Sequence, residues 1–315
     1  MRSKDFYERF RAEAAKAVVG QEEAVRLCGI ALVVGGHILL EGVPGTGKTL
    51  LAKSVACLLD LRFGRVQFTP DLMPADIVGT AVYDLQERSF RVRQGPIFTN
   101  ILLADEINRA PAKVQSALLE AMEEQGVSLE GEQRPLPDPF MVLATENPVE
   151  YEGTFPLPEA QQDRFLFKVV MDYPGPDAEM EVLARWNSGV ELRDPVAAGI
   201  TAVLSAEDVI ACRAEVTAVT ADEAIRRYIL DLAEATRLAP EVSLGASTRA
   251  MVLLMRAAKA AAAFDDRDYV VPDDVKSLLR PAFRHRLLLR PEAEVAGQSP
   301  DGVLDAVAAR VTPPR

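Results

Sequence analysis

The sequence predicts a mostly parallel α/β domain followed by a smaller, all-helical domain. Three observations lead to this prediction. Five short apolar runs are separated by helix-like or turn-like sequence, a glycine-rich turn stands between one run and a helical pattern, and from about Asp177 the runs give way to alanine-rich sequence. At 315 residues the chain is longer than one typical domain. We therefore expect two domains, 1–180 and 195–315, with the boundary between Tyr173 and Pro195, where proline and glycine recur.

The apolar runs have apolar residues on both faces, which is typical of strands buried in a parallel sheet between helices. They are HILLEG (37–42), GRVQFT (64–69), NILLADE (100–106), FMVLATEN (140–147) and RFLFKVVM (164–171). Together they predict a mostly parallel, five-stranded sheet. After the glycine-rich turn, Leu51, Val55, Leu58 and Leu59 recur at i, i+4, i+7 and i+8, which indicates one apolar face of a helix.

Two stretches interrupt the α/β domain. Residues 80–95 and 126–138 both alternate around a polar turn, which predicts β-hairpins, and neither contributes obviously to a core, so we expect both at the surface. In the second domain, the stretches 205–208 and 220–223 resemble capping boxes that begin at Ser205 and Thr220. Ser247 is expected to cap a further helix, and Pro272 fits the first position of another.

The composition argues against several classes of protein. A net charge of −12 disfavours a surface that coats nucleic acid non-specifically. Cys28, Cys57 and Cys212 lie far apart and only two histidines are present, so we expect buried thiols in a reducing compartment and no structural metal site. The N-terminal segment is charged throughout, unlike a signal peptide. The longest nearly apolar stretch, 27–40, is shorter than the ~20 residues of a spanning helix, so we expect a cytoplasmic protein without a membrane span.

The glycine-rich turn reads GVPGTGKT over residues 42–49 and fits the pattern G-x-x-x-x-G-K-[ST]. Glycines at 42, 45 and 47 let the backbone approach a phosphate closely because no Cβ intervenes, and N–H groups at the start of the following helix attract an anion. Lys48 would bind the β- and γ-phosphates, and Thr49 would ligate Mg²⁺. A glycine-rich turn that carries a lysine by chance is the alternative, but the flanking strand and helix favour nucleotide binding.

Asp105 and Glu106 follow a buried strand, at the edge of the sheet where open α/β proteins bind ligands. We expect Asp105 to hold Mg²⁺, largely through water, and Glu106 to polarise the attacking water. The pair could instead merely cap the next helix, but the upstream phosphate loop favours the catalytic interpretation. Asn147 ends another strand and could orient the same water, although an asparagine before proline is also common in turns.

Arginines are the third group of candidates, because phosphoryl transfer leaves negative charge on the γ-phosphate oxygens. Arg164 precedes a strand and could project from a subunit edge. Arg249 lies on a predicted helix of the second domain and could close over the nucleotide, and Arg109 closely follows the acid pair. Most surface arginines are simply solvated, so residue type alone does not choose among the three.

Several motifs, in this order, resemble the MoxR branch of the AAA+ ATPases: VVGQEEAV, GVPGTGKT, ADEINRAPAKVQSALLEAMEE, ATENPVEYEGTFPLPEAQQDRFLF and LGASTRA. The likeness extends from about Phe10 to Leu289. It implies a P-loop NTPase (AAA+) domain followed by a helical lid. It also implies ATP and Mg²⁺ as ligands, bound between these domains and at the interface between neighbours in a ring, usually a hexamer.

The resemblance also implies a role for each candidate. Gln21 and its neighbours would border the adenine, and Asn147 would be sensor 1. Arg249 would be sensor 2 and Arg164 the finger that reaches the next subunit's γ-phosphate, with Arg109 as the other candidate for that finger. The nucleotide-binding loop would comprise Gly42, Pro44, Gly45, Thr46, Gly47, Lys48, Thr49 and Leu50, and the second Walker element Asp105 and Glu106. Glu146 and Thr248 stand where the family more often has Gln and Pro, which leaves room for an altered rate.

By resemblance, the expected activity is chaperone-like: ATP-driven remodelling, maturation or metal insertion for partner proteins, which often carry a von Willebrand factor A domain. The two hairpins resemble family inserts that could face the pore or the partner. A nucleic-acid-remodelling motor is an alternative, supported by the cluster of Arg280, Arg284, Arg286 and Arg290 but opposed by the acidic composition. A regulatory scaffold that binds ATP with little hydrolysis is a second alternative, opposed by the intact Glu106.

Overall fold

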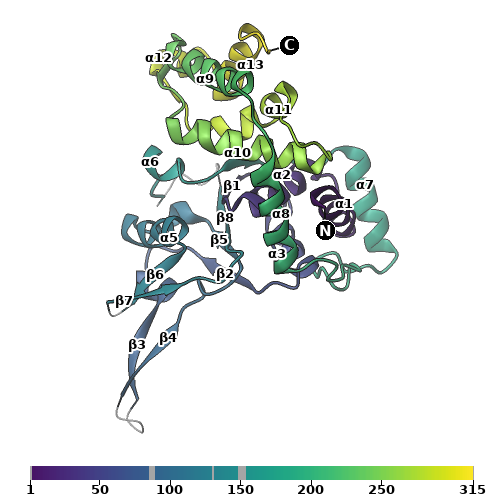
Figure 1. Cartoon of the computed structure of the whole chain (residues 1–315). Coiled ribbons are helices and arrows are strands. Elements are labelled where there is room, and N and C mark those ends of the chain that lie inside the picture. The colour runs from purple at the N-terminus through teal and green to yellow at the C-terminus, as the bar shows by residue number, and fades with distance from the viewer. Residues whose placement is uncertain (1, 85–88, 130, 148–153, 315) are drawn as a thin grey trace.

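The computed structural model describes residues 2–84, 89–129, 131–147 and 154–314 (Figure 1). The tips of both predicted hairpins (85–88 and 130) and the stretch 148–153 of the ATENPVEYEG motif lie outside the described residues. None of the helices in these ranges combines the length and apolar composition that crossing a membrane requires. The domain boundary between Tyr173 and Pro195 stays a prediction, and this segment contains one helix, α7 (Pro176–Asn187).

The predicted five-stranded parallel sheet is confirmed, with strand order β2-β5-β8-β1-β9. The strands are β1 (Ile38–Glu41), β2 (Phe63–Gln67), β5 (Ile101–Asp105), β8 (Met141–Glu146) and β9 (Phe167–Val170). All strands run in the same direction, so their carboxyl ends meet at one edge. In the registers, Gln67 lies opposite Asp105 and Glu41 opposite Glu146, which brings four polar side chains to that edge.

Helices cover the sheet because its strands carry apolar residues on both faces. In the α/β domain they are α1 (Ser3–Ala14), α2 (Glu22–Val34), α3 (Lys48–Leu58), α4 (Pro74–Val78), α5 (Ala112–Glu124) and α6 (Glu159–Gln162), with a 3₁₀ turn η1 (Ile107–Arg109). The predicted apolar face of α3 is buried, since Leu51, Val55, Leu58 and Leu59 are all inaccessible to solvent. Helix α3 begins at Lys48, directly after the glycine-rich turn, as the phosphate-binding motif predicts.

Both hairpin stretches form antiparallel pairs: β3 (Gly79–Asp84) with β4 (Ser89–Gln94), and β6 (Gly126–Leu129) with β7 (Glu132–Pro135). The first extends well away from the sheet (Figure 1). The expectation that neither contributes to a core is wrong for the second hairpin. Its residues Val127 and Leu129 are buried in a hydrophobic cluster together with Phe140 and residues of α5. One face of this short hairpin is apolar, and that face packs inward.

The lid contains α8 (Ala206–Ala218), α9 (Glu223–Leu238), α10 (Thr248–Phe264), α11 (Pro272–Phe283), α12 (Pro291–Val295) and α13 (Pro300–Arg310). Ser205 and Ser247 cap α8 and α10 as predicted, and Pro272 is the first residue of α11. Asp222, and not Thr220, caps α9, because the backbone of Thr220 pairs with Asp268 and Val270. The lid is not entirely helical: β10 (Val242–Leu244) and β11 (Leu288–Leu289) pair between its helices.

The lid shares one hydrophobic core with the α/β domain. Helices α8 and α10 pack on α2, and Tyr7 of α1 stacks on Phe264 of α10 with ring centroids 4.5 Å apart. Buried residues of α1, α2, α3 and the lid helices belong to a single cluster that also includes Cys28 and Cys212, which are buried thiols as expected. The expectation is wrong for Cys57, which packs against this cluster but is only partly buried. The two N-terminal helices therefore join the lid to the sheet.

Candidate active site

One cavity of about 1080 Å³ collects most of the predicted site residues. It is close to the upper limit of about 1,000 Å³ for small-molecule sites. The predicted residues that line it are Gln21, Pro44, Gly45, Thr46, Gly47, Lys48, Thr49, Leu50, Asp105, Glu106 and Asn147. The phosphate loop, the acid pair and the strand-end asparagine therefore face one space at the carboxyl edge of the sheet.

The loop has the backbone geometry that binding an anion requires. Gly45 and Gly47 have φ values of 89° and 90°, a region that residues with a Cβ rarely adopt, and a Cβ at either position would meet nothing within 4 Å. These glycines are therefore needed for their conformation and not to relieve crowding. Thr46 donates from Oγ1 to the carbonyl of Val43 at 3.1 Å, which ties the two ends of the turn together.

Gly42 has a different role from the one predicted. It is not among the residues that line the cavity, and a Cβ there would lie 2.3 Å from the carbonyl oxygen of Met171. Glycine is needed because β1 and β9 run side by side into this point, where the backbone of Met171 also donates to the carbonyl of Glu41. The first glycine of the motif thus serves the packing of the sheet.

Lys48 begins α3 and folds back over the loop. Its ammonium group donates to the carbonyl of Gly42 and, at 3.1 Å, to that of Val43. Burial lowers the pKa of Lys48, and the carboxylates of Asp105 and Glu106 oppose that shift. The cation is therefore held between the loop and the acid pair, where a polyanion could replace the carbonyl oxygens as its partner.

A buried threonine joins the two acids, and sequence analysis missed it. Thr145 on β8 donates from Oγ1 to Oδ1 of Asp105 at 2.7 Å. The Oγ1 atom of Thr145 also accepts a hydrogen bond from the backbone N–H of Glu106, at 2.8 Å. Glu106 has φ 55° and ψ 53°, a left-handed conformation that costs a residue with a Cβ roughly 1–2 kcal/mol. The hydroxyl of Thr145 therefore holds both the Asp105 carboxylate and the strained backbone that directs Glu106.

Strand β2 supplies two further partners. Arg65 donates from Nη2 to Oδ2 of Asp105 at 2.6 Å, and Gln67 donates from Nε2 to Oε2 of Glu106 at 2.7 Å. Arg109 also contacts that glutamate oxygen, at 3.1 Å from Nη1. Arg109 thus pairs with Glu106 of its own chain. Alternate residues of β2 point to one side of the sheet, so Arg65 and Gln67 reach neighbouring acids only in the observed register.

Helix α7 forms a largely apolar wall of the cavity, and this wall was not predicted. Helix α7 contributes Glu179, Val182, Leu183 and Trp186 at i, i+3, i+4 and i+7, which is one face of a helix. No residue of α7 is buried, and Leu183 and Trp186 are 61% and 55% exposed. Val18, Val19 and Gln21 line the cavity too. An apolar wall beside a phosphate loop suits a nucleotide base.

Glu146 also lines the cavity, next to Asn147. Burial raises the pKa of the Glu146 carboxyl, with Lys168 opposing and Glu41 reinforcing the shift. Lys168 pairs with Glu41 at 2.6 Å. The carboxyl at this position is therefore less readily ionised than an exposed one, which limits the negative charge that it adds beside Asn147.

The donors present are compatible with Mg²⁺. Among the described residues, no three His, Cys, Asp or Glu side chains are grouped so as to hold a metal ion by themselves. Mg²⁺ is usually held by one or two protein oxygens together with substrate phosphates and waters. The hydroxyl of Thr49 and the carboxylate of Asp105, which line one cavity with the phosphate loop, are oxygens of that kind.

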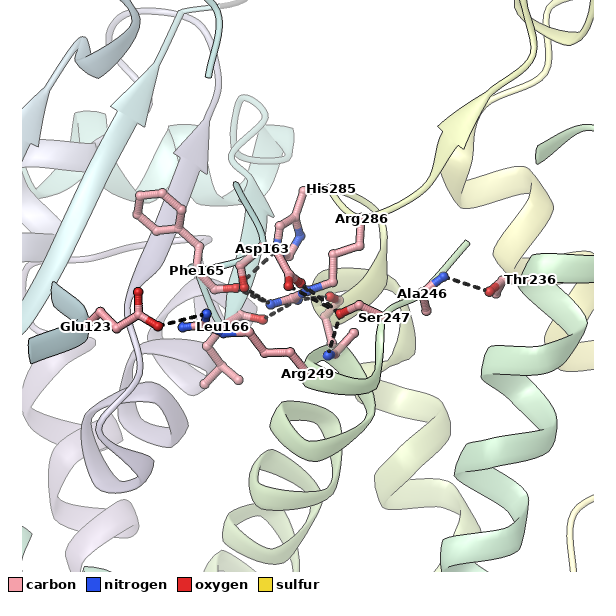
Figure 2. A network of polar contacts seen from close by, with 12 residues as sticks. Glu123, Asp163, Phe165, Leu166, Thr236, Ala246, Ser247, Arg249, His285 and Arg286 are labelled. Atoms are coloured by element: carbon pink, nitrogen blue, oxygen red, sulfur yellow. Dashed lines mark hydrogen bonds and ion pairs between the residues drawn. The ribbon is translucent and has the colours of Figure 1, made fainter. Parts of the chain in front are cut away.

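Arg164 and Arg249 lie together, but they do not line this cavity. Both contact Glu123, through Nη2 of Arg164 at 3.1 Å and Nη1 of Arg249 at 3.2 Å. They line a second cavity, of about 290 Å³, which they share with Arg213 and Arg256. Arg249 is in the first turn of α10, a lid helix that packs on α2, and it pairs with Glu123 of α5 outside this cavity (Figure 2). Within one chain, this position gives no support to the expectation that Arg249 could close over the nucleotide.

The arginine cluster of the lid is largely engaged within the chain. Arg280 pairs with Asp305, Arg284 with Asp301 at 2.7 Å, and Arg286 with Asp163 at 2.6 Å. The pairs of Arg280 and Arg284 lie within the lid, whereas the pair of Arg286 connects the lid to the segment before β9. Ion pairs of this kind neutralise the positive charge that a nucleic-acid surface would need.

Comparison with known proteins gives a consistent result. A family model of ATPases associated with various cellular activities (AAA) matches residues 37–167, and an AAA lid domain model matches residues 234–307. Chaperone MoxR1 of Mycobacterium tuberculosis (strain ATCC 25618 / H37Rv) is 42% identical over 98% of this chain and 82% of its own length. The uncharacterized protein YeaC of Bacillus subtilis (strain 168) is 45% identical over 95% of this chain and 92% of its own.

A solved structure agrees over nearly the whole length. A crystal structure of a protein assigned as an ATPase, from Cytophaga hutchinsonii, superposes with a TM-score of 0.90 at 42% identity and covers 99% of this chain and 97% of its own. The fold, the arrangement of the loop and acid pair, and these relatives agree with one another. The chain belongs to the MoxR family of AAA+ ATPases.

Proposed function

We propose that this protein hydrolyses ATP with Mg²⁺ as a ring of identical subunits and uses the energy to remodel partner proteins. The observation that supports hydrolysis most directly is the meeting of the phosphate loop, Lys48, the acid pair and Asn147 at one cavity. In this proposal Lys48 and the loop N–H groups bind the phosphates, Glu106 polarises the attacking water and Asn147 orients it. Mg²⁺, held by Thr49 and Asp105, would neutralise phosphate charge when bound.

The positions of the arginines support the proposed ring. Arg65 and Arg109 are engaged with Asp105 and Glu106 of the same chain. Arg164 and Arg249 are paired outside the cavity of their own chain, at positions 30% and 43% exposed. Charge that develops on the γ-phosphate would then be stabilised by arginines from a neighbour. We therefore propose that both arginines act on the adjacent subunit, and that Arg164, and not Arg109, is the finger.

Protein partners are the favoured substrate class. The name of the MoxR1 relative is that of a chaperone, and the lid arginines that a nucleic-acid motor could use are largely in ion pairs. The protruding β3–β4 hairpin offers exposed Val82 and Tyr83 for contact with a partner. More specifically, we propose that the partner protein carries a von Willebrand factor A domain.

Two variants test the proposal. Glu106→Gln should bind ATP with unchanged affinity but should not hydrolyse it. The ATP-bound variant should therefore retain partner proteins, which can be isolated with it, and wild-type protein serves as the control for that isolation. Arg164→Ala should bind ATP normally and lose about 10³-fold in turnover, by the magnitude of fingers supplied in trans. When these two variants are mixed, turnover should recover, because Arg164→Ala subunits keep intact acids and Glu106→Gln subunits supply intact arginines. No recovery, or normal turnover by Arg164→Ala alone, would refute the ring mechanism.

A further inference from the structure

Glu123 joins the two arginines that come from different domains. It lies near the end of α5, and Oε1 of its carboxylate faces Nη1 of Arg249 at 3.2 Å (Figure 2). The other oxygen, Oε2, faces Nη2 of Arg164 at 3.1 Å. Arg164 precedes β9 in the α/β domain, and Arg249 is in the first turn of α10 in the lid. Two guanidinium groups side by side repel each other, so a shared carboxylate is what allows them to stay together.

The backbones of both arginines are fixed by a second contact. Asp163, which precedes Arg164, accepts from Oγ of Ser247, at 3.2 Å to Oδ2, and from Nε of Arg286 at 2.6 Å. Ser247 caps the helix on which Arg249 lies. Arg286 is 2% exposed, so this link between lid and α/β domain is buried on the lid side. The chain therefore anchors the two arginines at their backbones through Asp163 and at their tips through Glu123.

The tips stay accessible in spite of these contacts. Arg164 also donates from Nη1 to the carbonyl of Leu119 at 2.8 Å, which lays its side chain along α5. Glu123 is 40% exposed. Each guanidinium has five N–H donors in a planar fork, so a contact with one carboxylate oxygen leaves donors for a second anion. The pair has the form of a preassembled receptor for an anionic group.

We propose that Glu123 is a positioning residue for ATP hydrolysis, which holds Arg164 and Arg249 as one unit so that both reach the terminal phosphate bound by the neighbouring subunit. This rests on the proposed ring mechanism. Glu123 does not touch the nucleotide and acts through the arginines. The alternative is that Glu123 forms only an ordinary surface ion pair, which contributes little to stability. The experiment must distinguish this alternative from a positioning role.

The test is the turnover of Glu123→Gln, which keeps the shape of the side chain and removes its charge. The matched control is Glu124→Gln, because Glu124 is the next residue of α5, is exposed and carries the same charge. Glu123→Gln should lower kcat about tenfold, the effect of losing one hydrogen bond between charged groups, with unchanged affinity for ATP. Glu124→Gln should stay within twofold. In a variant that lacks both arginines, Arg164→Ala with Arg249→Ala, Glu123→Gln should add almost no further loss.

Mixing separates this inference from a general structural effect. Glu123→Gln subunits have intact acids, so mixing them with Glu106→Gln subunits, which have intact arginines and Glu123, should restore turnover above the sum of the two alone. Wild-type or raised turnover by Glu123→Gln, or a loss that mixing does not restore while the Arg164→Ala mixture recovers, would overturn the inference. Failure of the Arg164→Ala mixture would instead refute the ring mechanism on which the inference rests.

Discussion

Replacing Thr145 by valine removes one hydroxyl and keeps the shape of a fully buried side chain. The Asp105 carboxylate then loses a hydrogen bond of 2.7 Å, and the N–H of Glu106 loses an acceptor at 2.8 Å. A hydrogen bond to a charged group contributes about 1.5–3 kcal/mol, and an unsatisfied buried donor costs about 1–3 kcal/mol. The lower ends of these ranges add to about 2.5 kcal/mol. If all of it acts on the transition state, turnover falls about 70-fold.

Thr145→Ser is the matched control, because it keeps the hydroxyl and loses only a methyl group. We expect kcat of Thr145→Val to fall by one to two orders of magnitude, with a much smaller change in the dissociation constant of ATP, measured by calorimetry. Thr145→Ser should retain most of the turnover. If Thr145→Val turns over ATP at the wild-type rate, the hydroxyl does not hold the acid pair. Equal losses in both variants would attribute the effect to packing of the methyl group.

Three further predictions concern the loop, the apolar wall and the histidines. Lys48→Ala should weaken ATP binding about 10²-fold or more, measured by calorimetry, because charge-assisted bonds to phosphate are lost; unchanged affinity would contradict the proposed phosphate site. Trp186 is the one tryptophan of the chain, so ATP should change its fluorescence while inorganic tripolyphosphate, which has no base, should not; equal responses would place the base elsewhere. Burial lowers the pKa of His37 to about 4 and that of His285 well below its usual value. Neither imidazole should titrate near pH 6.5 by NMR. Because the unfolded chain binds a proton at His37 before the folded chain does, the free energy of unfolding should fall by about 3 kcal/mol as the pH is lowered from 6.5 to 4.

The sequence was sufficient for those parts of the site that local pattern encodes. The five strands were predictable because both faces of each are apolar, and the loop because Gly45 and Gly47 need a conformation that other residues avoid. Asp105 and Glu106 were predictable as cavity residues because the strand before them ends at the edge where all five strands end. In each case a short stretch of chain contains the whole physical reason.

The parts that were missed depend on register and on packing between distant segments. Arg65 and Gln67 reach the acids only because β2 pairs with β5 in one particular register. In the sequence, Thr145 is an ordinary strand residue, and its contact with the acid pair arises only from the pairing of β8 with β5. Glu123 is one of three acidic residues on α5, and nothing in its neighbours in sequence indicates that two arginines, 41 and 126 residues further along, converge on it.

The same packing is the basis of our proposal that a single chain is a poor ATPase. The guanidinium groups of Arg65 and Arg109 lie beside the acid pair, where they form ion pairs with Asp105 and Glu106. Cations engaged in this way are less available for the charge that develops on a transferred phosphate. The Arg164–Arg249 pair lies outside that cavity because the lid packs on α1 and α2 and not over the phosphate loop. Under the proposed ring mechanism, activity would then depend on a neighbour, and assembly would be the step that completes the site.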